Sequence, residues 1–312
     1  MWNTLCMNLF SVAKQFPTED AAVEYWIATR WPDGVRCVEC GHDTVYRIKT
    51  VGKTGRPSLI FECGKCALHF SPTAGTLFHD SHLPLQKWFM AIALMCEGKK
   101  GISANQMKRH LGVTYKTAWF LCHRIRSAMA EESFDPLGSE GQIVEVDESF
   151  VGGSILRAGP KEAKRRKVKV LGIAERGGRI HLKKIKNLKP ETIAPILGPN
   201  ISPSAAGILT DGSTRYLNMI PKAKHIRGNH TEELKTGHVS NPAIEGAFSL
   251  FKRGVVGSYH KLGEEHMDAY LGEFCWRYNR RAEQPGIFDM ALSNMAREPL
   301  PYAKLKGGDN PF

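Results

Sequence analysis

The sequence lacks any apolar run of the roughly 18 residues that a helix needs to cross a bilayer, so no membrane-spanning segment is predicted. Its first residues, MWNTLCMNLFSVAKQF, also lack the basic stretch and the continuous apolar stretch of a secretory signal. No internal repeat is visible along the chain. We therefore expect a cytoplasmic protein that has no membrane partner.

Acidic residues are few relative to basic ones. Only 31 Asp and Glu residues stand against 43 Lys and Arg residues, which gives a formal net charge of +12. An excess of positive charge favours a polyanionic partner such as nucleic acid. A basic surface without such a partner is the alternative, because net charge alone does not identify a ligand. The 312 residues, of which 42% are apolar, suffice for one large domain or a few small ones with packed cores.

Disulfide bonds are not expected either, because a reducing cytoplasm keeps thiols free. Four of the eight cysteines form two Cys-x2-Cys pairs, with 22 residues between the pairs. Each pair lies on a glycine-containing knuckle, and four thiolates complete the tetrahedral shell of a structural zinc ion. A redox-active dithiol is the alternative, but it would need only one pair. The predicted zinc ligands are Cys37, Cys40, Cys63 and Cys66.

The remaining cysteines and the nearby histidines are not expected to bind metal. His42 and His69 lie beside the two pairs, but four cysteines already fill the zinc shell. The residues between the pairs are numerous enough for a β-hairpin around GKTGRPS. Isolated cysteines are commonly small buried apolar residues, and these are Cys6, Cys96, Cys122 and Cys275.

Four stretches before residue 131 have the apolar spacing and the capping residues of helices, namely 18–30, 85–97, 103–112 and 114–130. The last two are joined by a short turn, which is the layout of a helix-turn-helix DNA-binding motif. The basic side chains of the second helix are the predicted DNA contacts: Lys116, Arg124 and Arg126. An ordinary three-helix bundle is the alternative, but the zinc motif and the basic composition favour DNA binding.

After a polar linker at 131–141, strands alternate with helices. The predicted order, β-β-β-α-β-α-β-α with acidic residues at strand ends, indicates an α/β domain with a ribonuclease-H-like fold. The elements are a strand at 142–153, a hairpin at 167–185, a helix at 190–197, strands at 207–213 and 224–228, and helices at 241–254 and 264–281.

Three acidic residues on these elements are candidate ligands for catalytic metal ions. Phosphodiester cleavage in this kind of fold uses two Mg²⁺ ions about 3.5–4 Å apart, which require oxygen ligands. Asp147 lies near the end of the first strand, Asp211 at the end of a later strand and Glu245 on the helix that follows. Alternatively, Asp211 only shapes a turn and Glu245 is a surface charge.

The acidic neighbours of Asp147 are weaker candidates. Alternation along a strand places Glu148 on the opposite face from Asp147, so we expect only one of the two to bind metal. Glu145 shares the face of Asp147 and is a lesser candidate.

The helix at 241–254 combines an apolar stripe with an acid and a base in register. Lys252 follows Glu245 by two helical turns, so both side chains point nearly the same way. Asn241 is a suitable N-cap, and Pro242 suits the first helical position. The apolar stripe consists of Ile244, Ala247, Phe248 and Phe251.

Five blocks of the chain resemble insertion-sequence transposases of the DDE superfamily, in the ISXO2-like group that carries an N-terminal zinc ribbon. The resemblance extends from about residue 16 to residue 281. The blocks are RWPDGVRCVECG, FSPTAGTLFHDSHLPLQKWF, GVTYKTAWFLCHRIRSAM, VEVDESFVGG and NPAIEGAFSLFKRGVVGSYHKL.

The resemblance implies residue roles. It assigns the two aspartates to Asp147 and Asp211, the glutamate to Glu245, and a DNA-phosphate contact to Lys252. Because related groups replace the third acid by Asn or His, Asn241 and His238 stay open as alternatives to Glu245.

The resemblance also implies the reaction and its partners. An activated water cuts the strand at the end of the element, and the freed 3′-hydroxyl attacks target DNA. The expected cofactors are two magnesium or manganese ions and one structural zinc. The expected partners are double-stranded DNA, as inverted-repeat ends and as target, and further copies of the chain at the nucleoid. The basic stretch KEAKRRKVK is either a solvated loop or a phosphate-contacting segment, with Lys164, Arg165 and Arg166 as predicted contacts.

The predicted domains are an N-terminal helical segment at 1–32, a zinc ribbon at 33–72, a helix-turn-helix region at 80–131, a catalytic domain at 140–300 and a tail at 301–312. Two other functions are compatible with the same sequence features. One is a non-catalytic DNA-binding regulator with a decayed transposase domain. The other is a nuclease or resolvase that cuts DNA without joining it.

Overall fold

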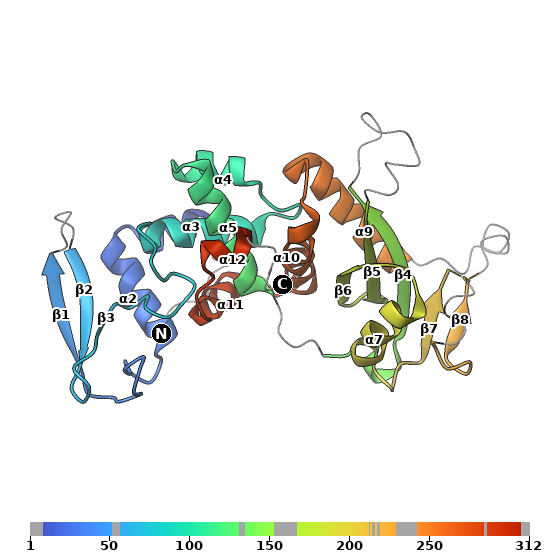
Figure 1. Cartoon of the computed structure of the whole chain (residues 1–312), viewed down its shortest axis with the longest axis horizontal. Helices are drawn as coiled ribbons and strands as arrows, with labels where there is room; N and C mark the ends of the chain where they lie inside the picture. Colours follow the sequence, from blue (N-terminus) through green and yellow to red (C-terminus); the bar gives the residue numbers. More distant parts are fainter. Residues whose placement is uncertain are drawn as a thin grey trace. The chain divides into compact units, whose positions relative to one another are not determined.

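The structure, a computed structural model, describes residues 9–51, 57–130, 135–152, 167–211, 213, 216, 219–228, 242–283 and 286–306. The chain forms two compact units (Figure 1). Within the described residues, the first unit combines 9–98, 104–129 and 283–306, and the second combines 99–103, 130 and 135–282. No helix in the described part of the chain is long and apolar enough to span a membrane.

The first unit begins with two helices and a small antiparallel sheet. Thr18 caps α2, because its Oγ1 accepts from the N–H of Ala21 at 3.2 Å. The predicted hairpin is confirmed by the pairing of β1 with β2, which runs from Val45 opposite Cys63. The elements are α1 (Leu9–Gln15), α2 (Glu19–Arg30), β1 (Val45–Val51), β2 (Pro57–Cys63) and β3 (His69–Phe70).

Three further helices of this unit lie where the sequence predicts them. Thr114 opens α5, since its Oγ1 accepts from the N–H of Thr117 at 3.2 Å. The buried cysteines Cys96 and Cys122 are packed in these helices as small apolar residues, as predicted, whereas Cys6 lies outside the described residues. The helices are α3 (Leu85–Glu97), α4 (Ala104–Leu111) and α5 (Tyr115–Met129).

The last described residues, 286–306, belong to this first unit. The predicted catalytic domain, 140–300, therefore extends too far along the chain. Phe288 is fully buried and packs edge-on against Phe89 of α3, with ring centroids 5.9 Å apart. Arg297 donates to the carbonyl of Ser127 in α5 at 3.0 Å. The returning elements therefore complete the core of the first unit, and they are α11 (Ile287–Ser293), η5 (Asn294–Ala296) and α12 (Tyr302–Lys306).

The second unit contains a five-stranded mixed sheet in the order β6-β5-β4-β7-β8, so its α/β class is confirmed (Figure 1). The three strands β4, β5 and β6 are antiparallel neighbours, and β7 and β8 are parallel to β4. The predicted order has a helix between β7 and β8, and several of the residues where it would lie are outside the described part of the chain. The strands are β4 (Ile143–Val151), β5 (Val168–Glu175), β6 (Ile180–Ile185), β7 (Gly207–Thr210) and β8 (His225–Arg227).

Each face of this sheet is covered by helices. One face packs against α9 (Pro242–Gly254) and α10 (Met267–Asn279), in a core that includes Cys275. The other face packs against α7 (Pro190–Asn200). Alternation along β4 sends Val144 and Val146 to the α7 side, and this leaves Glu145 and Asp147 for the α9 side.

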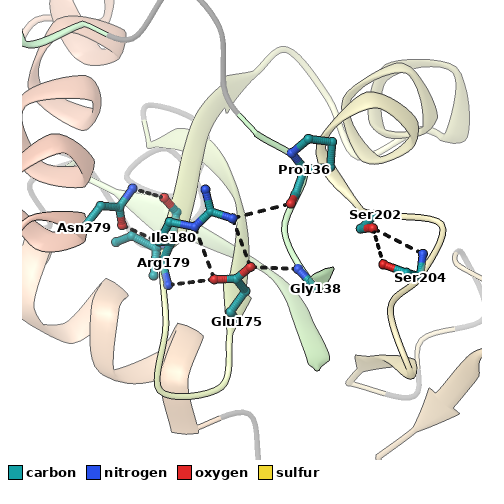
Figure 2. A network of polar contacts seen from close by, with 8 residues as sticks. All are labelled: Pro136, Gly138, Glu175, Arg179, Ile180, Ser202, Ser204 and Asn279. Atoms are coloured by element: carbon teal, nitrogen blue, oxygen red, sulfur yellow. Dashed lines mark hydrogen bonds and ion pairs between the residues drawn. The ribbon is translucent and has the colours of Figure 1, made fainter. Parts of the chain in front are cut away.

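A buried carboxylate fixes the turn between β5 and β6, where Gly177 adopts a φ of 73°. Figure 2 shows Glu175 accepting from the N–H of Gly138 at 2.8 Å and from the N–H of Arg179 at 3.1 Å. The Arg179 guanidinium forms an ion pair with the same carboxylate at 3.2 Å. These contacts lower the pKa of Glu175 against the effect of burial, which raises it.

Candidate functional site

The four predicted zinc ligands come together at the end of the small sheet. Their sulfur atoms all lie within 4.8 Å of one another, and three of the pairs are 3.6 Å apart. A tetrahedron with Zn–S bonds of about 2.3 Å has edges of about 3.8 Å, so the cluster has the size of a zinc shell. His42 and His69 are not members of this cluster. The ligand set is Cys37, Cys40, Cys63 and Cys66.

Backbone amides favour the thiolate form that zinc requires. The N–H groups of Cys66 and Lys65 point at the sulfur of Cys63 from 3.5 and 3.4 Å, and they lower the pKa of Cys63 to about 6. The N–H of Cys40 similarly lowers the pKa of Cys37. Burial and the neighbouring thiols of Cys63, Cys40 and Cys37 raise the pKa of Cys66 to about 12, against the effect of the Leu68 N–H. Zinc binding would therefore still displace the proton of the Cys66 thiol at neutral pH.

A second cluster of possible metal ligands lies where β7 ends beside β4, the central strand of the five-stranded sheet. Carboxylate oxygens of Asp147, Glu148 and Asp211 lie within 4.8 Å of one another. An octahedral Mg²⁺ site with bonds of about 2.1 Å holds its ligand oxygens about 3–4 Å apart, so small side-chain movements would let these three bind one ion. Asp211 also accepts from the N–H of Ser213 at 3.0 Å, so it both shapes a turn and belongs to the cluster.

The membership of Glu148 corrects the expectation that only one of Asp147 and Glu148 can serve. The described pairing of β4 with β7 ends at Glu145 opposite Leu209, and β7 itself ends at Thr210. Within the described residues, β4 has no paired strand on its β7 side from Val146 onward. Side chains from both faces can therefore reach Asp211, which follows the end of β7.

The environment of Asp147 is electrostatically unfavourable for a bare carboxylate. Burial raises the pKa of Asp147 to about 6, and the negative charges of Glu148, Asp211 and Glu245 add to the rise. The N–H of Glu148, which donates to Asp147 Oδ1 at 2.7 Å, opposes it. A bound cation would offset the repulsion, as is expected for a metal-ligating carboxylate.

The helix α9 supplies the other wall of the site. Its predicted apolar stripe is buried, and this fixes the rotation of the helix. Asp147, Glu245 and Lys252 line one cavity of about 650 Å³. The predicted acid and base of α9 thus face the first aspartate, although Glu245 lies outside the compact cluster of three carboxylates.

Several residues of this cavity were not predicted from the sequence. Lys100 lies on the short segment 99–103, and Arg253 follows Lys252 on α9. Ser149 shares the face of Asp147 two residues further along β4. Proximity of Lys100 to this cavity has no local sequence signal, because about 150 residues separate it from α9.

The lesser candidate Glu145 is not a member of the acidic cluster. Its side chain is fully buried and is directed at α9 and Arg176 instead. The alternatives Asn241 and His238, and the basic residues Lys164, Arg165 and Arg166, lie outside the described residues.

The predicted DNA contacts on α5 require a correction. Arg124 is 6% exposed and donates to the carbonyl of His79, and Arg126 is 1% exposed. Both are inside the first unit, because α5 is covered by neighbouring elements that include α11 and η5. Lys116 is exposed, as a DNA contact requires, and its ammonium lies 4.9 Å from the centre of the Tyr302 ring.

Comparison with known proteins gives two family matches. Residues 139–279 match the ISXO2-like transposase domain, and residues 17–69 match the transposase zinc-ribbon domain. An uncharacterized protein in the transposable element ISH50 of Halobacterium salinarum is 28% identical over 138 residues. That match covers 44% of this chain and 44% of the relative, so the aligned part spans less than half of the relative. No solved structure matches the chain.

Proposed function

The chain belongs to the ISXO2-like transposases that carry an N-terminal zinc ribbon, and we propose that it binds the ends of an insertion sequence and there cuts and joins DNA strands. The observation that carries the proposal is the single cavity lined by Asp147, Glu245 and Lys252, with Asp211 within reach of Asp147. The order of strands in the sheet supports a ribonuclease-H-like fold for this domain.

In the proposed mechanism, Asp147, Asp211 and Glu245 would hold two magnesium or manganese ions. Such ions, when bound, activate the attacking oxygen and stabilise the leaving oxygen of an in-line displacement. The carboxylates fix the geometry, because Asp147 lies on a central strand and Glu245 on a helix with a buried apolar stripe. The same residues serve strand cleavage by water and strand transfer by a 3′-hydroxyl.

The basic residues of the cavity would hold the DNA backbone. Lys252, Arg253 and Lys100 line the same cavity as the acids. Cations at this position can pair with the phosphates that flank the scissile bond, and this orients the bond toward the carboxylates. Loss of these contacts would weaken DNA positioning without removing the metal site.

The third ligand can be tested directly, because the structure offers two candidates. We expect Glu245→Gln to lower cleavage of a labelled element end by about 100-fold, since it removes one ligand of a two-ion site. Glu148→Gln should cost less, because Glu148 leaves the strand on the α7 side and does not line the cavity. The opposite order of the two losses would assign the third position to Glu148.

We propose that α4 and α5 contact the inverted repeat. With Arg124 and Arg126 buried, the accessible cations of this pair of helices are Lys108, Arg109 and Lys116. Lys108 and Arg109 lie in the last turn of α4, next to the turn that leads into α5. A helix-turn-helix that uses these three residues would bind DNA mainly through phosphates.

Replacing Lys116 by Ala is expected to weaken binding of element-end DNA and to lower the slope of log affinity against log salt by about 1. The physical reason is that the variant lacks one exposed lysine and so neutralises one phosphate fewer. Fluorescence anisotropy at several salt concentrations measures both quantities on the full chain, which is needed because residues 283–306 complete the first unit.

Lys14→Ala is the matched control, since Lys14 is an exposed lysine on α1 of the same unit. It should leave affinity and salt slope unchanged. Equal effects of the two substitutions would mean that α5 attracts DNA only through the general charge of the chain.

Metal-dependent cleavage of element-end DNA tests the proposed function as a whole. Binding without cleavage would leave a DNA-binding regulator. Cleavage without strand transfer would leave a nuclease or resolvase. As a transposase, the protein would act as a homo-oligomer on paired element ends and target DNA, in the cytoplasm at the nucleoid.

A further inference from the structure

The carboxylate of Glu145 is buried in the second unit and receives three N–H donors. Its Oε2 accepts from the backbone N–H of Ala243 at 2.9 Å and of Ile244 at 3.1 Å. Its Oε1 accepts from Arg176 Nε at 2.8 Å. The side chain is 0% exposed, so these donors replace the water that a carboxylate needs.

The two backbone donors belong to the first turn of α9. These amides have no partner within the helix, and a side chain just before the helix usually accepts from them. Here the acceptor comes from β4, about 100 residues earlier in the chain. Asn241, the N-cap predicted from the sequence, lies outside the described residues.

This contact joins the two elements that carry the candidate metal ligands. Glu145 precedes Asp147 by two residues on the same face of β4, and Ile244 immediately precedes Glu245 on α9. A carboxylate bound to both of the first free amides fixes the height and the direction of the helix start. The distance between Asp147 and Glu245 therefore depends on Glu145.

A glycine on β5 allows α9 to approach the sheet at the same place. Gly172 pairs with Asp147 across the β4–β5 ladder. A Cβ atom on Gly172 would lie 2.4 Å from Ile244 Cδ1 and 2.7 Å from Phe248 Cζ. Any larger residue would push the first turns of α9 away from the strand that carries Asp147.

We propose that Glu145 and Gly172 are positioning residues, which hold α9 so that Glu245 can bind the same metal ions as Asp147. The inference rests on the proposed function, since it assigns Glu245 to the metal site. Glu145 itself touches no metal and acts through the helix start. A residue of this kind affects metal affinity more than its contribution to folding alone would predict.

The same unit provides a matched control for a purely structural role. Glu175 on β5 is also a buried carboxylate that accepts from two backbone amides and pairs with an arginine, as Figure 2 shows. Its partners are Gly138 and Arg179, which both lie away from α9 in the chain. Glu145→Gln and Glu175→Gln are therefore the same chemical change in two similar networks.

The experiment compares the two variants in the full chain. Mn²⁺ binding is measured without DNA from the electron paramagnetic resonance signal of free Mn²⁺. Cleavage of a labelled element end is measured at saturating Mn²⁺. Thermal melting reports whether each variant is folded. We expect Glu145→Gln to weaken Mn²⁺ binding by about tenfold and cleavage by up to about 100-fold. Glu175→Gln should lower the melting temperature as much but leave Mn²⁺ binding and cleavage near wild type.

Hydrogen exchange gives a readout at the helix itself. A peptide that covers the first turn of α9 should exchange faster in Glu145→Gln than in wild type or Glu175→Gln, because glutamine cannot accept from both the amides and Arg176. Gly172→Ala, which leaves the polar network intact, should reproduce the loss of Mn²⁺ affinity. Adding Ile244→Val should restore part of it, because that change removes the nearest atom, Ile244 Cδ1.

The outcomes separate this inference from the proposed function. Wild-type Mn²⁺ affinity in folded Glu145→Gln or, where that variant does not fold, in Gly172→Ala would overturn the positioning role. Equal losses in Glu145→Gln and Glu175→Gln would overturn it as well. If wild type and the variants show the expected differences in Mn²⁺ affinity but wild type does not cleave DNA, the proposed reaction is overturned and the positioning role stands.

Discussion

Asp147→Asn is expected to abolish metal-dependent cleavage of element-end DNA, with a loss of about 1,000-fold or more. Asp147 is the one candidate ligand, among the described residues, that belongs both to the compact carboxylate cluster and to the cavity with Glu245 and Lys252. An amide keeps the shape of the side chain but removes the charge that attracts a divalent cation. Asp211→Asn should have an effect of the same order.

The Asp147→Asn protein should stay folded, and the raised pKa of Asp147 predicts whether the substitution raises or lowers the stability of the metal-free protein. Because burial raises the folded pKa from 3.8 to about 6, the metal-free protein loses stability as the pH rises through this interval. At pH 7 the charged carboxylate therefore destabilises the metal-free fold. The neutral Asp147→Asn variant should melt no lower than wild type in the presence of a chelator, and its advantage should vanish below a pH of about 4.

Asp268→Asn is a suitable control for the same assay. Asp268 is a mostly buried carboxylate of the second unit that accepts from the N–H of Lys184 at 3.0 Å, and it does not line the cavity. Its cleavage rate should stay within a few-fold of wild type. Normal cleavage by folded Asp147→Asn would mean that the metal site lies elsewhere.

Cys63→Ser is expected to remove zinc and to unfold the ribbon. Structural zinc contributes about 10–16 kcal/mol of binding free energy to small domains of this type, and much of it depends on complete thiolate ligation. Cys63 is only 1% exposed and packs in the ribbon core with Phe61 and Phe70. Loss of the metal should therefore expose these rings and the neighbouring Trp31 to water.

Metal analysis and tryptophan fluorescence check this expectation. Wild type should bind one zinc ion per chain, and Cys63→Ser should bind none. Cys96→Ser is the control, because Cys96 is a buried cysteine of the same unit outside the cluster, and its sulfur lies 3.8 Å from the carbonyl of Ile287, where a serine can still donate. Wild-type protein without zinc after growth in zinc-rich medium would contradict the assignment.

Local signals in the sequence predicted most of the elements and part of the site. The bounds of α3 agree with the predicted 85–97, because the apolar segment is followed by the break GKKG. Two paired Cys-x2-Cys motifs were sufficient to predict the zinc cluster. The apolar stripe of α9 predicted its buried face, and with it the side that carries Glu245 and Lys252.

Contacts between distant segments could not be predicted in the same way. Alternation along β4 predicted that Glu148 and Asp147 could not both reach one metal site, yet they belong to one cluster. The sequence of β4 does not indicate that its pairing with β7 ends at Glu145. Arg124 and Arg126 were expected on the surface because charged residues usually are, and the elements that cover α5 lie far along the chain. The hydrogen bonds of Glu145 to α9 likewise cannot be predicted from a local sequence pattern, because about 100 residues separate the partners.

The return of α11 and η5 to the first unit has a consequence for the order in which the protein is made. Phe288, Ala291, Leu292 and Met295 are fully buried there. While the ribosome is still translating the catalytic domain, the helices at 85–129 lack these side chains and expose the apolar surface that will cover them. The first unit can therefore reach its final packing only after synthesis has passed residue 295, so the second unit emerges from the ribosome complete before the first one does.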